Sequence, residues 1–185
     1  DIDGDGTQDL VMGNMGENGY LQPNAAAPVK LWINDFDGNE SIDKILTRTI
    51  NGRDVPVFLK GEMQEQIPLL KKENLNYEIY AKKAFQELFK KELVDKAAMK
   101  LYNYTSSIIA WGKGDGQFDV QRLPNEVQFS SLNAMVSTDV NADGKLDLVM
   151  GGNQFGFLPQ FGRLDANYGL VLINKGKRIL EVVED

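Results

Sequence analysis

The sequence predicts a mainly β fold with one helical insertion, and two observations carry this prediction. Nine-residue acidic loops recur at residues 1–9, 35–43 and 139–147, and each is followed by a short apolar run with the character of a strand. Residues 61–101 are instead rich in Lys, Glu, Leu and Ala, with apolar residues at helical spacing. The acidic loops and their strands therefore form the framework, and the helical region interrupts it.

The domain organisation follows from the positions of these segments. We expect one structural unit, and we expect it to be a piece of a longer protein, because the sequence begins at the first residue of an acidic loop. Its predicted parts are the first two loops in residues 1–60, the helical insertion in 61–101, and the third loop with flanking hairpins in 102–185.

The first part alternates strands with loops. Residues 10–12 leave the first acidic loop as a strand, and residues 14–28, rich in Gly, Asn, Pro and Ala, form an irregular loop. Residues 29–33 form a strand that leads into the second acidic loop. The dipeptide Asn51-Gly52 lies between two apolar runs, which predicts a hairpin with a two-residue type I′ turn.

The insertion contains helical patterns. A short helix precedes Pro68, and a second extends over Lys91–Leu101. Between them, one apolar stripe recurs at helical spacing: Tyr77, Tyr80, Ala81, Ala84, Phe85, Leu88 and Phe89. We interpret this stripe as the face that packs on a sheet; the alternative is an aromatic platform for a ligand.

The last part returns to β structure. Residues 106–111 and 117–122 flank the glycine-rich turn GKGDG as a hairpin. Residues 132–138 lead into the third acidic loop, and residues 146–150 leave it. After an irregular loop at 153–167, the final strands are expected at 168–173 and 178–183.

The acidic loops have the composition of a site for a hard cation. Each has an oxygen-bearing side chain at loop positions 1, 3, 5 and 9, and such side chains at alternate positions of a tight loop are typical calcium ligands. The EF-hand pattern fails, because position 12 is apolar in all three copies. Asx-turns without a metal are the alternative. The proposed side-chain ligands are Asp1, Asp3, Asp5, Asp9, Asp35, Asp37, Asn39, Asp43, Asp139, Asn141, Asp143 and Asp147.

The sixth position of each loop calls for a left-handed turn, which glycine adopts at least cost. Gly6 and Gly144 occupy it in the first and third loops, whereas the second loop has Glu40. We expect calcium occupancy in the order third, second, first. The third loop is framed by apolar strands, and Asp1 of the first loop has no strand before it to hold it.

Composition excludes several functions. The formal net charge of −7 argues against nucleic-acid binding. No run of eighteen apolar residues is present, so we expect no membrane span, and no signal peptide is visible. With no histidine and no cysteine, Ser-His-Asp and Cys-His catalysis are excluded. Calcium loops of modest affinity favour an extracellular, periplasmic or outer cell-surface location.

The loops and their exit strands resemble a known repeat. Residues 1–14 align with residues 139–153, and both contain DLVMG. This pattern resembles the FG-GAP or VCBS repeat, which builds calcium-binding blades of β-propellers such as those of integrin α subunits. GKGDGQF at 112–118 is similar to a hairpin of VCBS repeats, and the longer pattern resembles secreted bacterial VCBS proteins similar to cartilage acidic protein.

The resemblance implies a fold, a set of ligands and a function. It implies partial propeller-like blades, since three repeats cannot close a propeller, and open blade edges that could pair with another chain. It implies that the backbone carbonyls of Thr7, Ser41 and Lys145 complete the calcium sites. It also implies a binding module for protein or glycan rather than an enzyme.

The binding surface is expected in the two irregular loops, on the same side of neighbouring blades. Phe155, Arg163, Asp165 and Tyr168 are the candidate ligand-binding residues. Alternatively, the calcium is purely structural. The remaining alternative is a glycosidase or lyase that uses Asp165 and Glu17; against it, Asp165 and Arg163 could simply form a loop-bracing ion pair.

Overall fold

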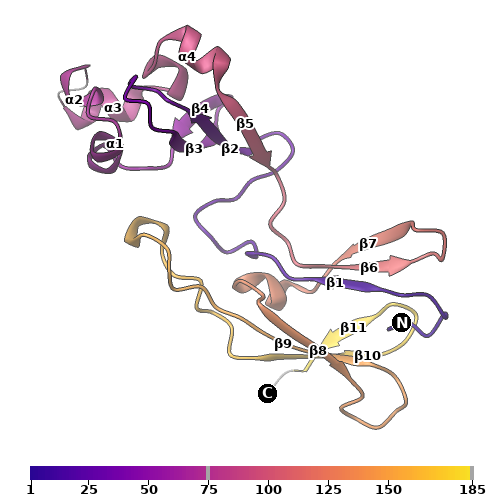
Figure 1. Ribbon diagram of the computed structural model, residues 1–185. Helices are drawn as coiled ribbons and strands as arrows, with labels where there is room; N and C mark the ends of the chain where they lie inside the picture. Colours follow the sequence, from indigo (N-terminus) through magenta and orange to yellow (C-terminus); the bar gives the residue numbers. More distant parts are fainter. Residues whose placement is uncertain (74–75, 184–185) are drawn as a thin grey trace. The chain divides into compact units, whose positions relative to one another are not determined.

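The computed structural model describes residues 1–73 and 76–183. Over these ranges the chain is mainly β, with eleven strands in three antiparallel sheets and four short α-helices, as the sequence predicts (Figure 1). No closed barrel or propeller is formed by the described residues. None of the helices in those ranges is long and apolar enough to cross a membrane.

The chain divides into two compact units. The first unit comprises Asp1–Gln22 and Thr105–Asp185, and the second comprises Pro23–Tyr104. The second acidic loop therefore belongs with the helical region and not with the first loop. The first unit is assembled from distant segments, because strand β1 pairs with strand β6, about a hundred residues further along the chain.

The first unit contains two of the sheets. One has the order β1-β6-β7, with β1 at Leu10–Met12, β6 at Ile108–Gly112 and β7 at Phe118–Arg122. The other is a meander of β8 (Ala134–Thr138), β9 (Asp147–Gly151), β10 (Leu170–Asn174) and β11 (Leu180–Val182). Short 3₁₀ turns lie at Asn125–Phe129 and Pro159–Phe161.

One apolar core joins these two sheets. It contains Ile109 and Trp111 of β6 and Leu148, Met150, Leu172 and Leu180 of the meander, with Val11, Met135, Leu170 and Val182 packed against it. Each buried side chain of this size contributes on the order of 1.5–3 kcal/mol to folding. The two sheets are therefore held face to face by apolar burial.

The second unit has one sheet of order β4-β3-β2-β5. Its strands are β2 (Val29–Asn34), β3 (Asp43–Ile50), β4 (Arg53–Pro56) and β5 (Ala98–Tyr102). Its helices are α1 (Lys60–Gln66), α2 (Leu70–Glu73), α3 (Tyr77–Lys82) and α4 (Lys91–Lys96), with a 3₁₀ turn at Phe85–Glu87. The core of this unit is formed by Phe36, Ile45, Met63, Ile67, Leu70, Tyr80, Phe85 and Leu88.

Asn51-Gly52 forms the predicted hairpin between β3 and β4. Both residues have positive φ, 50° and 74°, which is the signature of a type I′ turn. The strands predicted to leave the first and third acidic loops are also confirmed, as β1 and β9.

The helix expected over Lys91–Leu101 is wrong in its second half. Helix α4 ends at Lys96, and Ala98–Tyr102 is strand β5, paired with β2 over five residue pairs. Local propensity favours helix for this Ala-, Met-, Lys- and Leu-containing segment, but pairing with a distant strand decides its conformation.

The apolar stripe from Tyr77 to Phe89 forms a broken element rather than one helix. Helix α3 ends at Lys82, whose carbonyl accepts a hydrogen bond from the Arg53 guanidinium at 3.1 Å, and Arg53 also pairs with Glu87. Phe85 still stacks on Trp32 of the sheet, with ring centroids 4.6 Å apart. The interpretation of the stripe as a packing face is confirmed for Tyr80, Ala84, Phe85 and Leu88, while Tyr77 and Ala81 are exposed.

Candidate metal centre

The three acidic loops share one backbone conformation. Positions 4 and 6 both have left-handed φ in every copy, supplied by Gly4 and Gly6, Gly38 and Glu40, and Ala142 and Gly144. The second loop therefore makes the same turn as the others, with Glu40 at φ 66°. Sequence reasoning anticipated position 6 but missed position 4, because Ala142 carries no sign of a left-handed backbone.

The aspartate at position 1 organises the inside of each loop. The Asp1 carboxylate accepts hydrogen bonds from the N–H groups of Gly4 and Gly6 at 2.8 and 2.9 Å. Asp35 accepts from Gly38 and Glu40 at 2.8 and 2.9 Å, and Asp139 accepts from Gly144 at 2.8 Å. In all three copies the loop thus folds around one carboxylate.

The aspartate at position 9 ties each loop to its surroundings. One oxygen accepts the N–H of position 2, at 2.6 Å for Asp9, 3.0 Å for Asp43 and 3.0 Å for Asp147. The other oxygen of Asp9 accepts the N–H of Gly112, and that of Asp147 accepts the N–H of Asn174. In the first and third loops this carboxylate therefore connects the loop to the next strand of its sheet.

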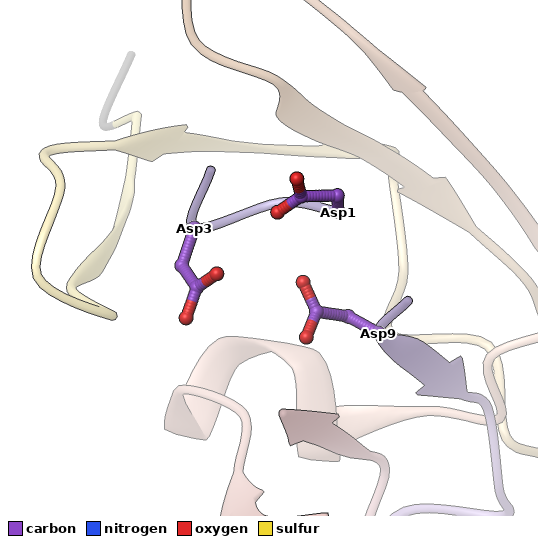
Figure 2. A group of neighbouring side chains, drawn as sticks. All are labelled: Asp1, Asp3 and Asp9. Carbon is purple, nitrogen blue, oxygen red and sulfur yellow. The ribbon is translucent and has the colours of Figure 1, made fainter. Parts of the chain in front are cut away.

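Positions 1, 3 and 9 converge in two of the loops. Asp1, Asp3 and Asp9 each offer one oxygen, and these oxygens lie within 4.8 Å of one another, as do those of Asp35, Asp37 and Asp43. Figure 2 shows the first group, with its carboxylates gathered around one small space. The third loop has Asn141 at position 3, so it presents an amide oxygen where the others present a carboxylate.

Position 5 is arranged differently. The side-chain oxygens of Asp5, Asn39 and Asp143 accept the N–H groups of Thr7, Ser41 and Lys145 at 2.7–2.9 Å. Hydrogen bonds lower the pKa of the Asp5 carboxyl, chiefly that from the Thr7 hydroxyl. The roles of the position-5 side chains and of the position-7 carbonyls as calcium ligands remain predictions.

Two loops carry a cation from the chain itself. The Arg178 guanidinium, from the turn between β10 and β11, donates to Asp3 at 2.7 Å and lies 3.6 Å from Asp5. In the third loop, the Lys145 ammonium lies 3.0 Å from Asp143 and lowers the pKa of that carboxyl. Among the described residues, no Lys or Arg forms an ion pair with a carboxylate of the second loop.

The second loop instead holds an unsatisfied oxygen. Asp37 Oδ1 is shielded from solvent and accepts no hydrogen bond from any described residue. For Asp35, burial raises the pKa, but hydrogen bonds from backbone N–H groups, chiefly Glu40, lower it overall. Both observations describe a site that retains its negative charge and has a free acceptor.

The candidate ligand-binding residues lie on the loop that follows β9. Phe155, Arg163, Asp165 and Tyr168 are all exposed, and Tyr168 almost completely so. Within the part of the chain that the structure describes, Arg163 and Asp165 form no ion pair, so the loop-bracing interpretation is not supported. The expected neighbourhood of the two irregular loops is supported at one point, where the rings of Tyr20 and Phe161 lie 5.4 Å apart.

Glu17 is the centre of a polar cluster with Arg122 and Ser106. Its carboxylate binds the Arg122 guanidinium through two hydrogen bonds of 2.6 and 2.8 Å and accepts the Ser106 hydroxyl at 2.6 Å. These contacts, led by Arg122, lower the pKa of Glu17 to about 2. A glycosidase pair needs one carboxyl group with a raised pKa and one ionised carboxylate, so Glu17 could serve only as the ionised member. The glycosidase or lyase alternative stays a prediction.

Asn174 was missed from the sequence. It is buried, and its side-chain amide donates to the carbonyls of Ile2 and Leu146 at 2.7 and 3.2 Å. It therefore joins the first acidic loop to the third, although the two are far apart in the chain. A single Asn before a Gly-containing turn resembles any turn residue, which is why its sequence context gave no signal.

Comparison with models of protein families gave no match, and neither did comparisons with curated proteins or with solved structures.

Proposed function

We propose that this chain is an extracellular, calcium-binding repeat module that presents a surface for a protein or glycan ligand. The observation that carries the proposal is the convergence of three carboxylates in each of the first two acidic loops, within one shared backbone frame. Three like charges so close together repel one another, and a bound cation removes that repulsion.

The donor set favours calcium over other metals. The sites contain only oxygen donors, and the sequence has neither histidine nor cysteine, the usual ligands of zinc and copper. Calcium accepts six to eight oxygens in flexible geometry, whereas magnesium demands a nearly ideal octahedron. The buried acceptor Asp37 Oδ1 fits this interpretation, because a cation would satisfy it.

The role proposed for calcium is to brace the sheets. Asp9 accepts a hydrogen bond from the Gly112 N–H of β6, and Asp147 accepts one from the Asn174 N–H of β10. An ion bound to either loop would therefore also fix the carboxylate that holds the neighbouring strand. In the second loop the equivalent contact comes from a helix, since Gln66 of α1 approaches Asp43 at 3.4 Å. The chain's own residues would thus couple ion binding to the order of the surrounding structure.

The display surface is the loop after β9. It leaves a four-stranded antiparallel meander, the arrangement of one propeller blade, and Phe155, Arg163, Asp165 and Tyr168 are all exposed along it. Exposed aromatic and charged groups on a loop held by a rigid sheet are typical of recognition surfaces. We therefore propose partial blades of the FG-GAP or VCBS kind and no catalytic role.

Calcium titration tests the proposal directly. Thermal unfolding should move to higher temperature as calcium is added, because the ion binds the folded state preferentially, and magnesium at equal concentration should have a smaller effect. The triple variant Asp1→Asn, Asp35→Asn, Asp139→Asn should lose the response. Asp115→Asn, in an exposed turn outside the loops, is the matched control.

A melting temperature that does not depend on calcium would contradict the metal proposal, as would an equal response in the triple variant. For the ligand surface, binding to glycan and protein arrays should be reduced by Tyr168→Ala and Phe155→Ala. Binding that survives both changes would show that recognition lies elsewhere, while leaving the calcium proposal intact.

A further inference from the structure

The two sheets of the first unit are equivalent in detail. Strands β1 and β9 have the same sequence, and their partners pair in the same register: Leu10 lies opposite Ala110 as Leu148 lies opposite Leu172. The next pairs agree as well, since Ala110 faces Val120 and Leu172 faces Val182. The residues of β1 and β6 and residues 118–120 of β7 therefore have counterparts in the β9-β10-β11 part of the meander.

Equivalent residues nevertheless have opposite exposure. Leu10 and Met12 are 45% and 42% exposed, whereas their counterparts Leu148 and Met150 are 1% and 3% exposed. The reverse holds on the other side of the sheets, where Val11 packs into the core while its counterpart Val149 is exposed. Each sheet therefore uses a different one of its two faces to form the shared core.

Two apolar faces are left without a partner among the described residues. The first, here called the leucine face, lies on the β1-β6-β7 sheet and contains Leu10, Met12, Phe118 and Val120. The second, here called the valine face, lies on the meander; it contains the exposed Val136 and Val149 and the half-buried Val171 and Ile173.

These two faces should fit each other, because their counterparts already pack against each other in the core of the unit. The leucine face is the counterpart of the meander face that is buried in the core, and the valine face is the counterpart of the buried face of the β1-β6-β7 sheet. Side chains of the same kind thus already pack against each other once inside the unit. Apolar surface left in water favours a repeat of that packing.

We propose that a second copy of this chain docks its valine face on the leucine face of the first copy and so repeats the internal sheet-on-sheet packing between molecules. The contact joins two different surfaces, so it is head-to-tail, and the pair as a whole keeps one free leucine face and one free valine face. This self-association is independent of calcium and goes beyond the proposed binding function.

The proposed contact between molecules lacks the polar contacts that Arg178 makes inside the unit. Inside the unit, Arg178 stacks on Trp111 at 5.4 Å, and Gln121 donates to the Arg178 carbonyl at 3.3 Å. At the leucine face, Gly116 occupies the position equivalent to Arg178, and at the valine face Ile173 replaces Trp111. We therefore expect association that depends on protein concentration rather than a permanent dimer.

Sedimentation velocity in EDTA tests the proposal. The weight-average sedimentation coefficient should rise between about 1 µM and about 500 µM protein, a range that includes weak specific association. Val120→Glu on the leucine face and Val136→Glu on the valine face should each abolish the rise. Val120 and Val136 are both more than 60% exposed, so we expect the fold to tolerate glutamate at either position. Far-ultraviolet circular dichroism would verify this. Leu69→Glu, at an exposed apolar position outside both faces, should leave the rise unchanged.

Mixing the two variants separates head-to-tail packing from other arrangements. An equimolar mixture of Val120→Glu and Val136→Glu retains one intact face of each kind, so it should form a heterodimer that neither variant forms alone. A wild-type chain that stays monomeric over the whole range would overturn the proposal. So would association that persists in either single variant, because it would indicate like-to-like contact or pairing through the edge of β1.

Discussion

Replacing Lys145 with glutamine should strengthen calcium binding by the third acidic loop. The Lys145 ammonium lies 3.0 Å from Asp143 Oδ2, an oxygen predicted to bind the ion. A calcium ion lies about 2.4 Å from a carboxylate ligand, so it would be about 5 Å from the ammonium nitrogen. Charges of +2 and +1 at that distance repel by about 1.7 kcal/mol in water, and screening by salt reduces this to about 1 kcal/mol.

That energy corresponds to an affinity about five-fold higher in the Lys145→Gln variant. The ion pair lost in the exchange is exposed and contributes little to stability. Lys145 gives a cleaner test than Arg178, since Arg178 also contacts Asp119 and Trp111, and its replacement would disturb the core.

The assay is isothermal titration in a background that leaves only the third loop competent, with Asp1→Asn and Asp35→Asn. Lys90→Gln, an exposed residue of the compact unit that does not contain the third loop, is the matched control and should change the affinity less than two-fold. An affinity that is unchanged or weaker in Lys145→Gln would refute the reasoning, because it would show that Lys145 orders the loop more than it competes with the ion.

The remaining predictions concern the second loop, its turn and the polar links of the first unit. In chains with one intact loop, the second should bind calcium most tightly, because no Lys or Arg of the described ranges pairs with its carboxylates and Asp37 Oδ1 accepts no hydrogen bond there; titration of the three single-loop chains checks this. Glu40→Gly should raise the free energy of unfolding in EDTA by up to about 1 kcal/mol, since φ is 66° there, and urea denaturation measures it. Asn174→Ala should lower that free energy by about 2–3 kcal/mol in the same assay, because one buried and one partly buried carbonyl lose their donor. The pKa of Glu17 is depressed to about 2 from 4.5, so the stability from its pair with Arg122 is present above pH 4.5 and is lost as the pH falls toward 2; Glu17→Gln should flatten that part of the pH–stability profile, and an unchanged slope would contradict the assignment.

Local signals predicted much of the β framework. The exit strands β1 and β9 follow from apolar runs after the acidic loops, and the turn at Asn51-Gly52 follows from two residues that tolerate positive φ. These features depend on a few neighbouring residues. Sequence patterns describe such features well because the physical cause lies within the pattern itself.

Features set by distant partners were not predicted. Strand β5 has a helical composition, and only its pairing with β2 reveals it as a strand. The division into two units likewise depends on the pairing of β1 with β6, two strands that are separated in sequence by the whole second unit. The sequence-based affinity order of third, second, first rests on the strands that frame each loop, and it stays a prediction. It does not include Lys145 and Arg178, whose places beside the loops depend on the fold.

The acidic loops are already held in shape by their own hydrogen bonds, and this limits how much order a calcium ion could add to them. Nearly all position-1 and position-9 oxygens already accept backbone N–H groups, so the loop conformation is formed by the chain itself. An ion would then join a prepared frame rather than fold a disordered segment, and little of its binding free energy would be spent on ordering. Because Asp9 and Asp147 each hold one N–H of the loop and one of the adjoining strand, that binding energy would be transmitted to the β1–β6 and β9–β10 pairs. These are the strands that carry the shared core on one side and the free leucine and valine faces on the other. Calcium should therefore stiffen the surfaces that the module presents without changing which residues they expose.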